Sequence, residues 1–119
     1  MRVSREEFEA LVERALDQLP PEFAELLDNI VVVVEDEPEP ELLAEMGMDA
    51  DEELLGLYRG VPQTERETGY FSLPDQVSIY RGPLLRICRD RRELIREVRD
   101  TVVHELGHYF GLSDEEMPY

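Results

Sequence analysis

The stretch "TVVHELGHYFGLSDEE", residues 101–116, contains both histidines of this chain. It continues an apolar pattern that begins further upstream and repeats at the spacing of an α-helix. The residues of this pattern are Leu94, Ile95, Val98, Val102, Leu106 and Tyr109. Asp90 precedes the pattern and can cap a helix N-terminus. The sequence therefore predicts one long amphipathic helix from Asp90 to about Tyr109 or Phe110.

On such a helix His104 and His108 lie one turn apart on the same face, roughly 130° from the middle of the apolar stripe. Two imidazoles at this spacing can bind one zinc ion, and Glu105 between them can reach a water on that ion. "HELGH" has the HExxH pattern that is typical of zinc hydrolases. The alternative is a pair of surface histidines that make ordinary hydrogen bonds.

A turn is expected directly after this helix. Gly111 stands where a helix C-terminus favours a residue in the left-handed region. The chain can then reverse and bring Asp114 toward the metal as a third ligand, which leaves a fourth position for water. In the alternative interpretation, Ser113 or Asp114 simply caps a new turn.

Three further residues near the motif have two interpretations each. Gly107 in mid-helix costs about 1 kcal/mol relative to alanine, which indicates a close backbone approach, expected from the sheet. Met117 can lie under the metal site or belong to an ordinary packed or frayed end. Cys88 is expected to be a small buried apolar residue, and its alternative is a thiolate ligand of the zinc.

The rest of the chain predicts a small α+β domain that spans residues 1–119. Ser4 and Glu7 form a capping box for a first amphipathic helix, which Pro20 ends. Further elements are expected as a short helix at 21–29, a buried strand at 30–34, a solvated loop at 35–41, strands at 54–59 and 76–80, and a short helix at 84–88.

The charge of the chain excludes some classes of partner. Its 29 acidic and 12 basic residues give a net charge of −17 at pH 7, which repels nucleic acid and anionic membranes. Residues 81–100 differ, with seven arginines and four acids. This basic strip either attracts an acidic partner or consists of arginines that are solvated or paired within the fold.

The N-terminal residues show no signal-peptide pattern, and no stretch is apolar enough to span a membrane. The chain contains one cysteine, so no internal disulfide can form. These features favour a cytoplasmic location.

Three stretches carry a resemblance to a known family. "HELGHYFGLSD" fits HExxHxxGxxD, and it is joined upstream by "LYRGVPQTER" and "PDQVSIYRGP". Together they resemble the small bacterial zincin-like metallopeptidases, or minimal zincins, over about half of the chain. The resemblance implies a small twisted mixed sheet packed on a backing helix at residues 4–19 and on the C-terminal metal helix. It also implies His104, His108 and Asp114 as ligands of one zinc ion and Glu105 as the catalytic base.

The implied activity is zinc-dependent hydrolysis of a peptide bond in a peptide or protein substrate. Glu105 takes the proton of the attacking water and returns it to the leaving amine. An edge strand is expected to pair with the substrate, with 76–80 as the first choice. The candidates for oxyanion stabilisation are Tyr80, Arg81, Tyr109 and Tyr119. A second copy of the chain or another protein can complete the cleft. The alternative function is a non-catalytic zinc module that binds other proteins through its acidic surface.

Overall fold

The fold is α+β and contains a small three-stranded mixed sheet, as expected. It is seen in a computed structural model that describes residues 1–49, 51–60, 74–112 and 114–118. The elements are α1 (Arg5–Leu16), α2 (Pro21–Leu26), a 3₁₀ turn η1 (Leu27–Asn29), β1 (Ile30–Glu35), α3 (Pro40–Glu45), β2 (Gly56–Arg59), β3 (Asp75–Tyr80), α5 (Arg81–Ile87), α6 (Arg91–Tyr109) and a second 3₁₀ turn η2 (Asp114–Glu116). The turn expected after β2 lies outside the described residues.

The three strands are arranged in the order β1-β3-β2. β1 runs parallel to β3, with Val32 opposite Val77, and β2 runs antiparallel to β3, with Tyr58 opposite Val77. The prediction that residues 76–80 form the substrate-binding edge is therefore wrong, because both sides of β3 are already paired. β2 is the edge strand beside α6.

The strand predicted at residues 30–34 is confirmed, but the prediction that it is buried is wrong. β1 is the other edge of the sheet, and its valines are mostly only half-buried. The side chain of Val31 is 45% exposed. A run of β-branched residues indicates a strand in either setting, so the pattern cannot distinguish an edge strand from a central one.

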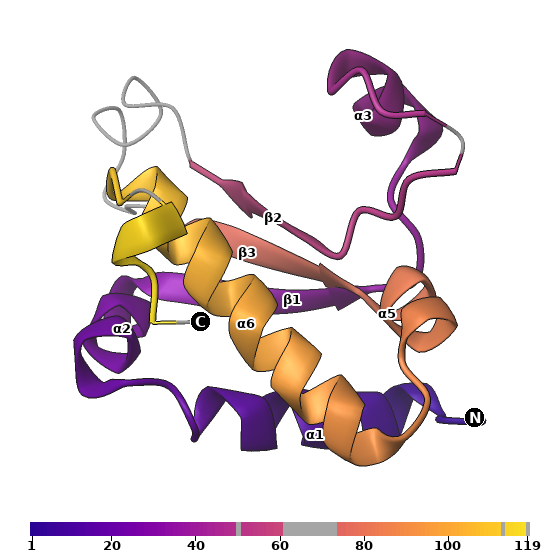
Figure 1. Ribbon diagram of the computed structural model, residues 1–119, viewed down its shortest axis with the longest axis horizontal. Helices are drawn as coiled ribbons and strands as arrows, with labels where there is room; N and C mark the ends of the chain where they lie inside the picture. Colours follow the sequence, from indigo (N-terminus) through magenta and orange to yellow (C-terminus); the bar gives the residue numbers. More distant parts are fainter. Residues whose placement is uncertain (50, 61–73, 113, 119) are drawn as a thin grey trace.

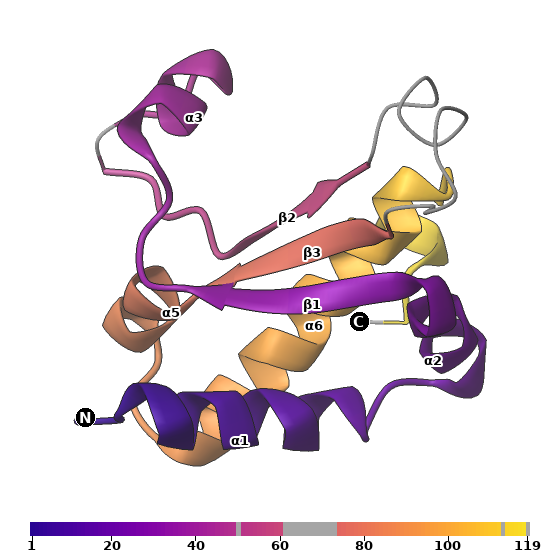
Figure 2. The same cartoon turned by 180° about the vertical axis from the view of Figure 1, so that it is seen from behind.

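Helix α6 crosses one face of the sheet, and α1 packs against α6 (Figure 1). Seen from behind, the sheet lies in front of α6 (Figure 2). The core between these layers consists of apolar side chains from all three elements: Phe8, Leu11, Val12 and Ala15 of α1, Val77 and Ile79 of β3, and Val98, Val102 and Leu106 of α6. Among the described helices, none combines the length and the apolar composition that crossing a membrane needs.

Both long helices begin at the caps that the sequence indicates. The Ser4 hydroxyl accepts a hydrogen bond from the Glu7 N–H at 3.1 Å, and the Asp90 carboxylate accepts one from the Glu93 N–H at 2.8 Å. Each cap satisfies a backbone donor that the first helical turn leaves without a partner. These contacts fix where α1 and α6 start.

The loop expected at residues 35–41 ends earlier than the sequence indicates. Helix α3 begins at Pro40, which occupies the first helical position, where its missing N–H costs nothing. Leucine and alanine residues then favour continuation of the helix. The charge and proline content of residues 35–41 favoured a loop, so the start of this short helix was not predicted.

Candidate metal centre

The two histidines lie on the flank of α6 that faces away from the core. The ring centroids of His104 and His108 are 5.9 Å apart, and the ring planes are inclined at 82°. His104 is half-buried and His108 is exposed. Zinc bound to two imidazole nitrogens at about 2.0–2.1 Å requires ring centres within roughly 6.5 Å of each other. The centroid separation of the pair is therefore within the range that two ligands of one zinc ion allow.

Glu105 extends from the same helix toward β2. Its Oε1 atom accepts a hydrogen bond from the backbone N–H of Tyr58 at 2.9 Å. The N–H of Tyr80 donates to the carbonyl of Leu55 at 2.9 Å, so the backbone groups of Leu55 point toward β3. In an antiparallel pair, the backbone groups of successive residues point alternately toward the partner strand and away from it. The N–H of Tyr58 accordingly points to the open edge of the sheet, where Glu105 binds it.

β2 and α6 run side by side in the same direction (Figure 1). Three contacts show this, because Gly56 lies against Thr101, Tyr58 against Glu105 and Gly60 against Tyr109. A Cβ atom on Gly56 would lie 2.6 Å from Cγ2 of Thr101 and 3.0 Å from the Ser78 carbonyl oxygen. The absence of a side chain at Gly56 thus lets the helix approach the strand.

A groove of about 400 Å³ follows this flank of α6. It is lined by Leu54, Leu55 and Gly56 on the strand side and by Glu97, Asp100, Thr101, His104 and Glu105 on the helix side. The predicted base and one predicted zinc ligand therefore face a space beside the edge strand.

The end of α6 has the predicted left-handed glycine. Gly111 has φ +86°, its N–H donates to the His108 carbonyl at 3.1 Å, and the Leu112 N–H donates to the Gly107 carbonyl at 2.8 Å. These two bonds form a Schellman motif, which satisfies carbonyls at the helix end and turns the chain back.

Met117 explains the glycine inside the helix. Met117 is buried, and a Cβ atom on Gly107 would collide with its Sδ and Cε atoms. The expected close approach is therefore confirmed, but it comes from the C-terminal segment and not from the sheet. Met117 packs in the core against Gly107, the helix residue next to His108, so Met117 itself is a packed residue.

The third predicted ligand lies at the limit of what the structure describes. The backbone of Asp114 begins η2, and its side chain lies outside the described part, as does all of Ser113. Among the side chains that are described, no three histidine, cysteine, aspartate or glutamate residues form a group that could hold a metal. His104, His108 and Glu105 thus lie together, and ligation by Asp114 stays a prediction.

The four oxyanion candidates lie in different places. Tyr80 is buried on the opposite face of the sheet from α6, where its hydroxyl accepts a hydrogen bond from Arg59. Arg81 bonds Asp36 and the Val3 carbonyl. Tyr119 lies outside the described residues. Tyr109 alone of the described candidates lies beside the histidines, on α6.

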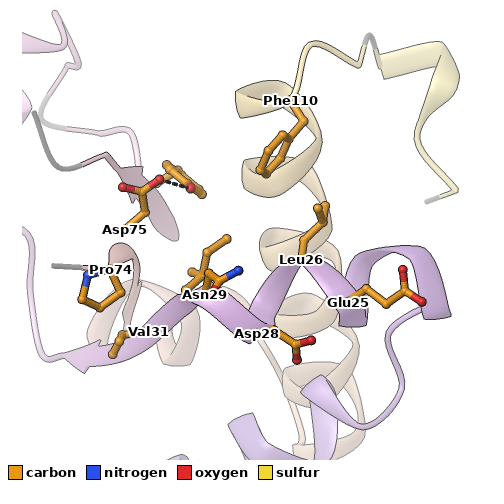
Figure 3. Close-up of a pocket in the computed structure, with 10 residues that line it drawn as sticks. Glu25, Leu26, Asp28, Asn29, Val31, Pro74, Asp75 and Phe110 are labelled. Atoms are coloured by element: carbon orange, nitrogen blue, oxygen red, sulfur yellow. Dashed lines mark hydrogen bonds between the residues drawn. The ribbon is translucent and has the colours of Figure 1, made fainter. Parts of the chain in front are cut away.

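An aromatic and acidic cluster next to the site was missed in the sequence. Tyr58 and Tyr109 stack with ring centroids 3.8 Å apart, and the Tyr58 hydroxyl donates to Oδ2 of Asp75 at 2.6 Å. Asp75 is 8% exposed. This carboxylate and Phe110, labelled in Figure 3, are among the residues that line a pocket of about 780 Å³. The alternation of strand residues places Tyr58 and Asp75 on the same face as Val77, and this was the available signal.

Cys88 has the character of a buried structural residue. It is 6% exposed and belongs to the core cluster. Burial raises the pKa of its thiol to about 11, and the neighbouring carboxylates of Glu93 and Glu97 act in the same direction. A thiol with this pKa is a poor nucleophile at neutral pH.

Comparison with known proteins agrees with this architecture. The chain belongs to the zincin-like metallopeptidase family, whose sequence profile matches residues 27–119. It is also similar to a solved structure, a conserved hypothetical protein from Thermo thermophilus, with 28% sequence identity and a TM-score of 0.59. That similarity covers 90% of this chain and 94% of the other chain. A search of curated proteins finds no significant match.

Proposed function

We propose that this protein is a zinc-dependent metallopeptidase that binds one zinc ion through His104, His108 and Asp114 and uses Glu105 as its general base. The observation that carries the proposal is the position of Glu105. It lies between the two histidines in the sequence, its carboxylate reaches the edge of β2, and the two histidine rings are 5.9 Å apart. Membership of the zincin-like metallopeptidase family supports the same activity.

The described donors are chemically suited to zinc. Neutral imidazole nitrogens are common zinc ligands, and a carboxylate from Asp114 would complete a three-residue set with an open position. His104, His108 and Asp114 would hold the zinc ion, which would supply activation of a water molecule and polarisation of the substrate carbonyl group. Glu105 is the residue in this arrangement that can take the proton of the attacking water and return it to the leaving amine.

The free edge of β2 supplies a place for an extended peptide. Tyr58 directs its N–H outward, and a substrate strand can accept a hydrogen bond from it. In the structure Glu105 accepts this bond, so substrate binding requires Glu105 to release the N–H. The released carboxylate is then available for the water, close to the peptide bond held along β2.

The first experiment compares metal content and peptide cleavage in the tag-free full-length protein and two variants. We expect about one zinc per chain in the wild type and almost none in His108→Ala, measured by plasma mass spectrometry. Glu105→Gln should keep the zinc and lose cleavage of a mixed peptide library by at least about 100-fold. Glu97→Gln, which changes another carboxyl group in the same groove, is the matched control and should keep both.

Two results would contradict the proposal. If the wild type holds no zinc after zinc is supplied and the excess is removed, the protein has no zinc site of the proposed kind. Zinc binding with no cleavage by the wild type, together with folding that depends on zinc, would favour the non-catalytic zinc module.

A further inference from the structure

A pocket lined by arginines lies between α1 and the first half of α6, away from the histidine pair. Its volume is about 420 Å³. Four guanidinium groups and two other residues line it: Arg14, Gln18, Arg92, Ile95, Arg96 and Arg99. Figure 1 shows how α6 crosses α1 in this region. The chain as a whole has a net charge of −17, so this is a local reversal of its charge.

Helix geometry brings the arginines together. Arg92, Arg96 and Arg99 are spaced i, i+4 and i+7, which places them along one side of α6. Arg14 lies in the last turn of α1, across the pocket from them. Like charges four residues apart destabilise a helix by about 0.2–0.5 kcal/mol per pair. The arrangement thus has an energetic cost that an anion in the pocket would remove.

Three of these four arginines differ in their contacts from the other arginines of residues 81–100. The remaining arginines of residues 81–100 form ion pairs with carboxylates: Arg81, Arg86, Arg89 and Arg91. Arg5 of α1 does so as well. Arg99 bonds its neighbour Asp100 at 2.9 Å. Arg14, Arg92 and Arg96 form no hydrogen bond or ion pair with the parts of the chain that the structure describes.

The basic strip in the sequence therefore divides into two parts. Most of its arginines are paired within the fold, and Arg92 and Arg96 are exposed, so both groups fit the interpretation of solvated or paired arginines. Arg92 and Arg96 have no carboxylate partner in the described structure, although the chain has 29 acidic residues. The chain therefore has enough carboxylates to pair these two guanidinium groups, yet both line a pocket together with Arg14.

We propose that this pocket binds a compact anion that carries two or more phosphate groups. The planar guanidinium group donates paired hydrogen bonds to phosphate oxygens, and the three groups of Arg14, Arg92 and Arg96 around one space suit a ligand with several of them. The volume lies in the range of small-molecule sites. A long polyanion would extend onto the acidic surface and be repelled, so the charge of the chain favours a small ligand.

The test is a calorimetric titration of the full-length, zinc-loaded protein with inorganic pyrophosphate at low salt. We expect saturable binding to the wild type and binding at least about tenfold weaker in the Arg92→Ala/Arg96→Ala double variant, because charge-assisted hydrogen bonds are lost. The control is Arg2→Ala/Arg89→Ala, which changes the net charge equally outside the pocket. Thermal unfolding followed by circular dichroism checks that both double variants fold.

Each other outcome overturns the proposal. No saturable binding to the wild type, or equal loss in the two double variants, would show that the pocket is not a specific anion site. Binding that survives Arg92→Ala/Arg96→Ala and disappears in His108→Ala would place the anion at the histidine pair. Citrate binding as tight as pyrophosphate binding would overturn the assignment to phosphate.

Discussion

The backbone N–H of Tyr58 donates a hydrogen bond to the carboxylate of Glu105 at 2.9 Å, across a sequence separation of 47 residues. This bond joins α6, the helix that carries both histidines, to the edge strand β2. It also places the predicted base at the strand edge. Because both groups belong to the protein, this position does not depend on a metal or a substrate.

We expect amide exchange of Tyr58 to report the position of Glu105. A net hydrogen bond contributes about 0.5–1.5 kcal/mol, so Glu105→Ala should speed the exchange of this amide by about tenfold. Glu105→Gln retains an acceptor oxygen and should preserve most of the protection. Hydrogen exchange followed by NMR measures both.

Glu97→Ala is the control for this measurement, because Glu97 faces the same groove with no hydrogen bond to β2 in the described structure. If Tyr58 exchanges equally fast in the wild type and Glu105→Ala, Glu105 does not face the strand edge in solution.

The contact between Gly107 and Met117 gives a second prediction. Alanine at position 107 improves helix propensity by about 1 kcal/mol, but its Cβ would meet the flexible end of the Met117 side chain, which must then move. We therefore expect Gly107→Ala to raise the free energy of unfolding by clearly less than about 1 kcal/mol. In a Met117→Ala background no side chain has to move, so the same substitution should raise it by the full amount.

Urea denaturation of the wild type, the two single variants and the double variant forms a double-mutant cycle for this pair. A coupling energy near zero would mean that Met117 does not pack on Gly107. Gly47→Ala is not a suitable control, because Gly47 itself has φ +67° and alanine there is strained.

Local signals were sufficient for the long helices and for the histidine pair. Periodicity and capping residues determine where α1 and α6 begin, and the four-residue spacing of His104 and His108 places them on one flank. Gly111 adopts the left-handed conformation that its position after the helix predicts. These features depend on residues close together in the chain.

Features that depend on distant residues were not predictable in the same way. The strand order is set by pairing between segments far apart, and therefore the central position of β3 was missed. The partner of Gly107 comes from beyond the helix end, and the partner of Glu105 comes from β2. A sequence pattern can indicate that Gly107 allows a close approach or that Glu105 acts as a base. It does not identify the distant residue that contacts either of them.

Arg86 gives a prediction about acid pH. It bonds Glu53 at 2.8 Å and Glu37 at 2.7 Å, which ties the segment around α3 to α5. The hydrogen bond and charge of Arg86 lower the pKa of Glu53 below its ordinary value. The stabilisation is therefore present above the ordinary glutamate pKa and is lost as the pH falls through the lowered pKa.

Replacing Arg86 by glutamine should return the Glu53 pKa toward its ordinary value, as followed by NMR of the side-chain carboxyl carbon. The loss of stability should be small, because the pair is near the surface. Arg89→Gln, which affects an ion pair with Glu93, is the control and should leave the Glu53 titration unchanged. An unchanged titration in Arg86→Gln would show that the two side chains do not pair in solution.

Cys88 gives a prediction about alkaline pH. Burial raises the pKa of its thiol from 9.0 to about 11, so the folded protein holds the thiol proton where the unfolded chain releases it. Between these values the unfolded state binds fewer protons, and the free energy of unfolding should fall as the pH rises. Cys88→Ala should flatten this decrease in urea denaturation curves measured from pH 8 to pH 11.

The same pKa predicts slow alkylation of the native thiol. A shift of about two units reduces the thiolate fraction about 100-fold near pH 8, and burial slows the reagent further. Iodoacetamide labelling, followed by mass spectrometry, should therefore be fast in urea and slow in the native protein. The native rate should be the same with and without zinc, because Cys88 lies in the core cluster. Rapid native labelling that zinc blocks would instead identify Cys88 as a metal ligand.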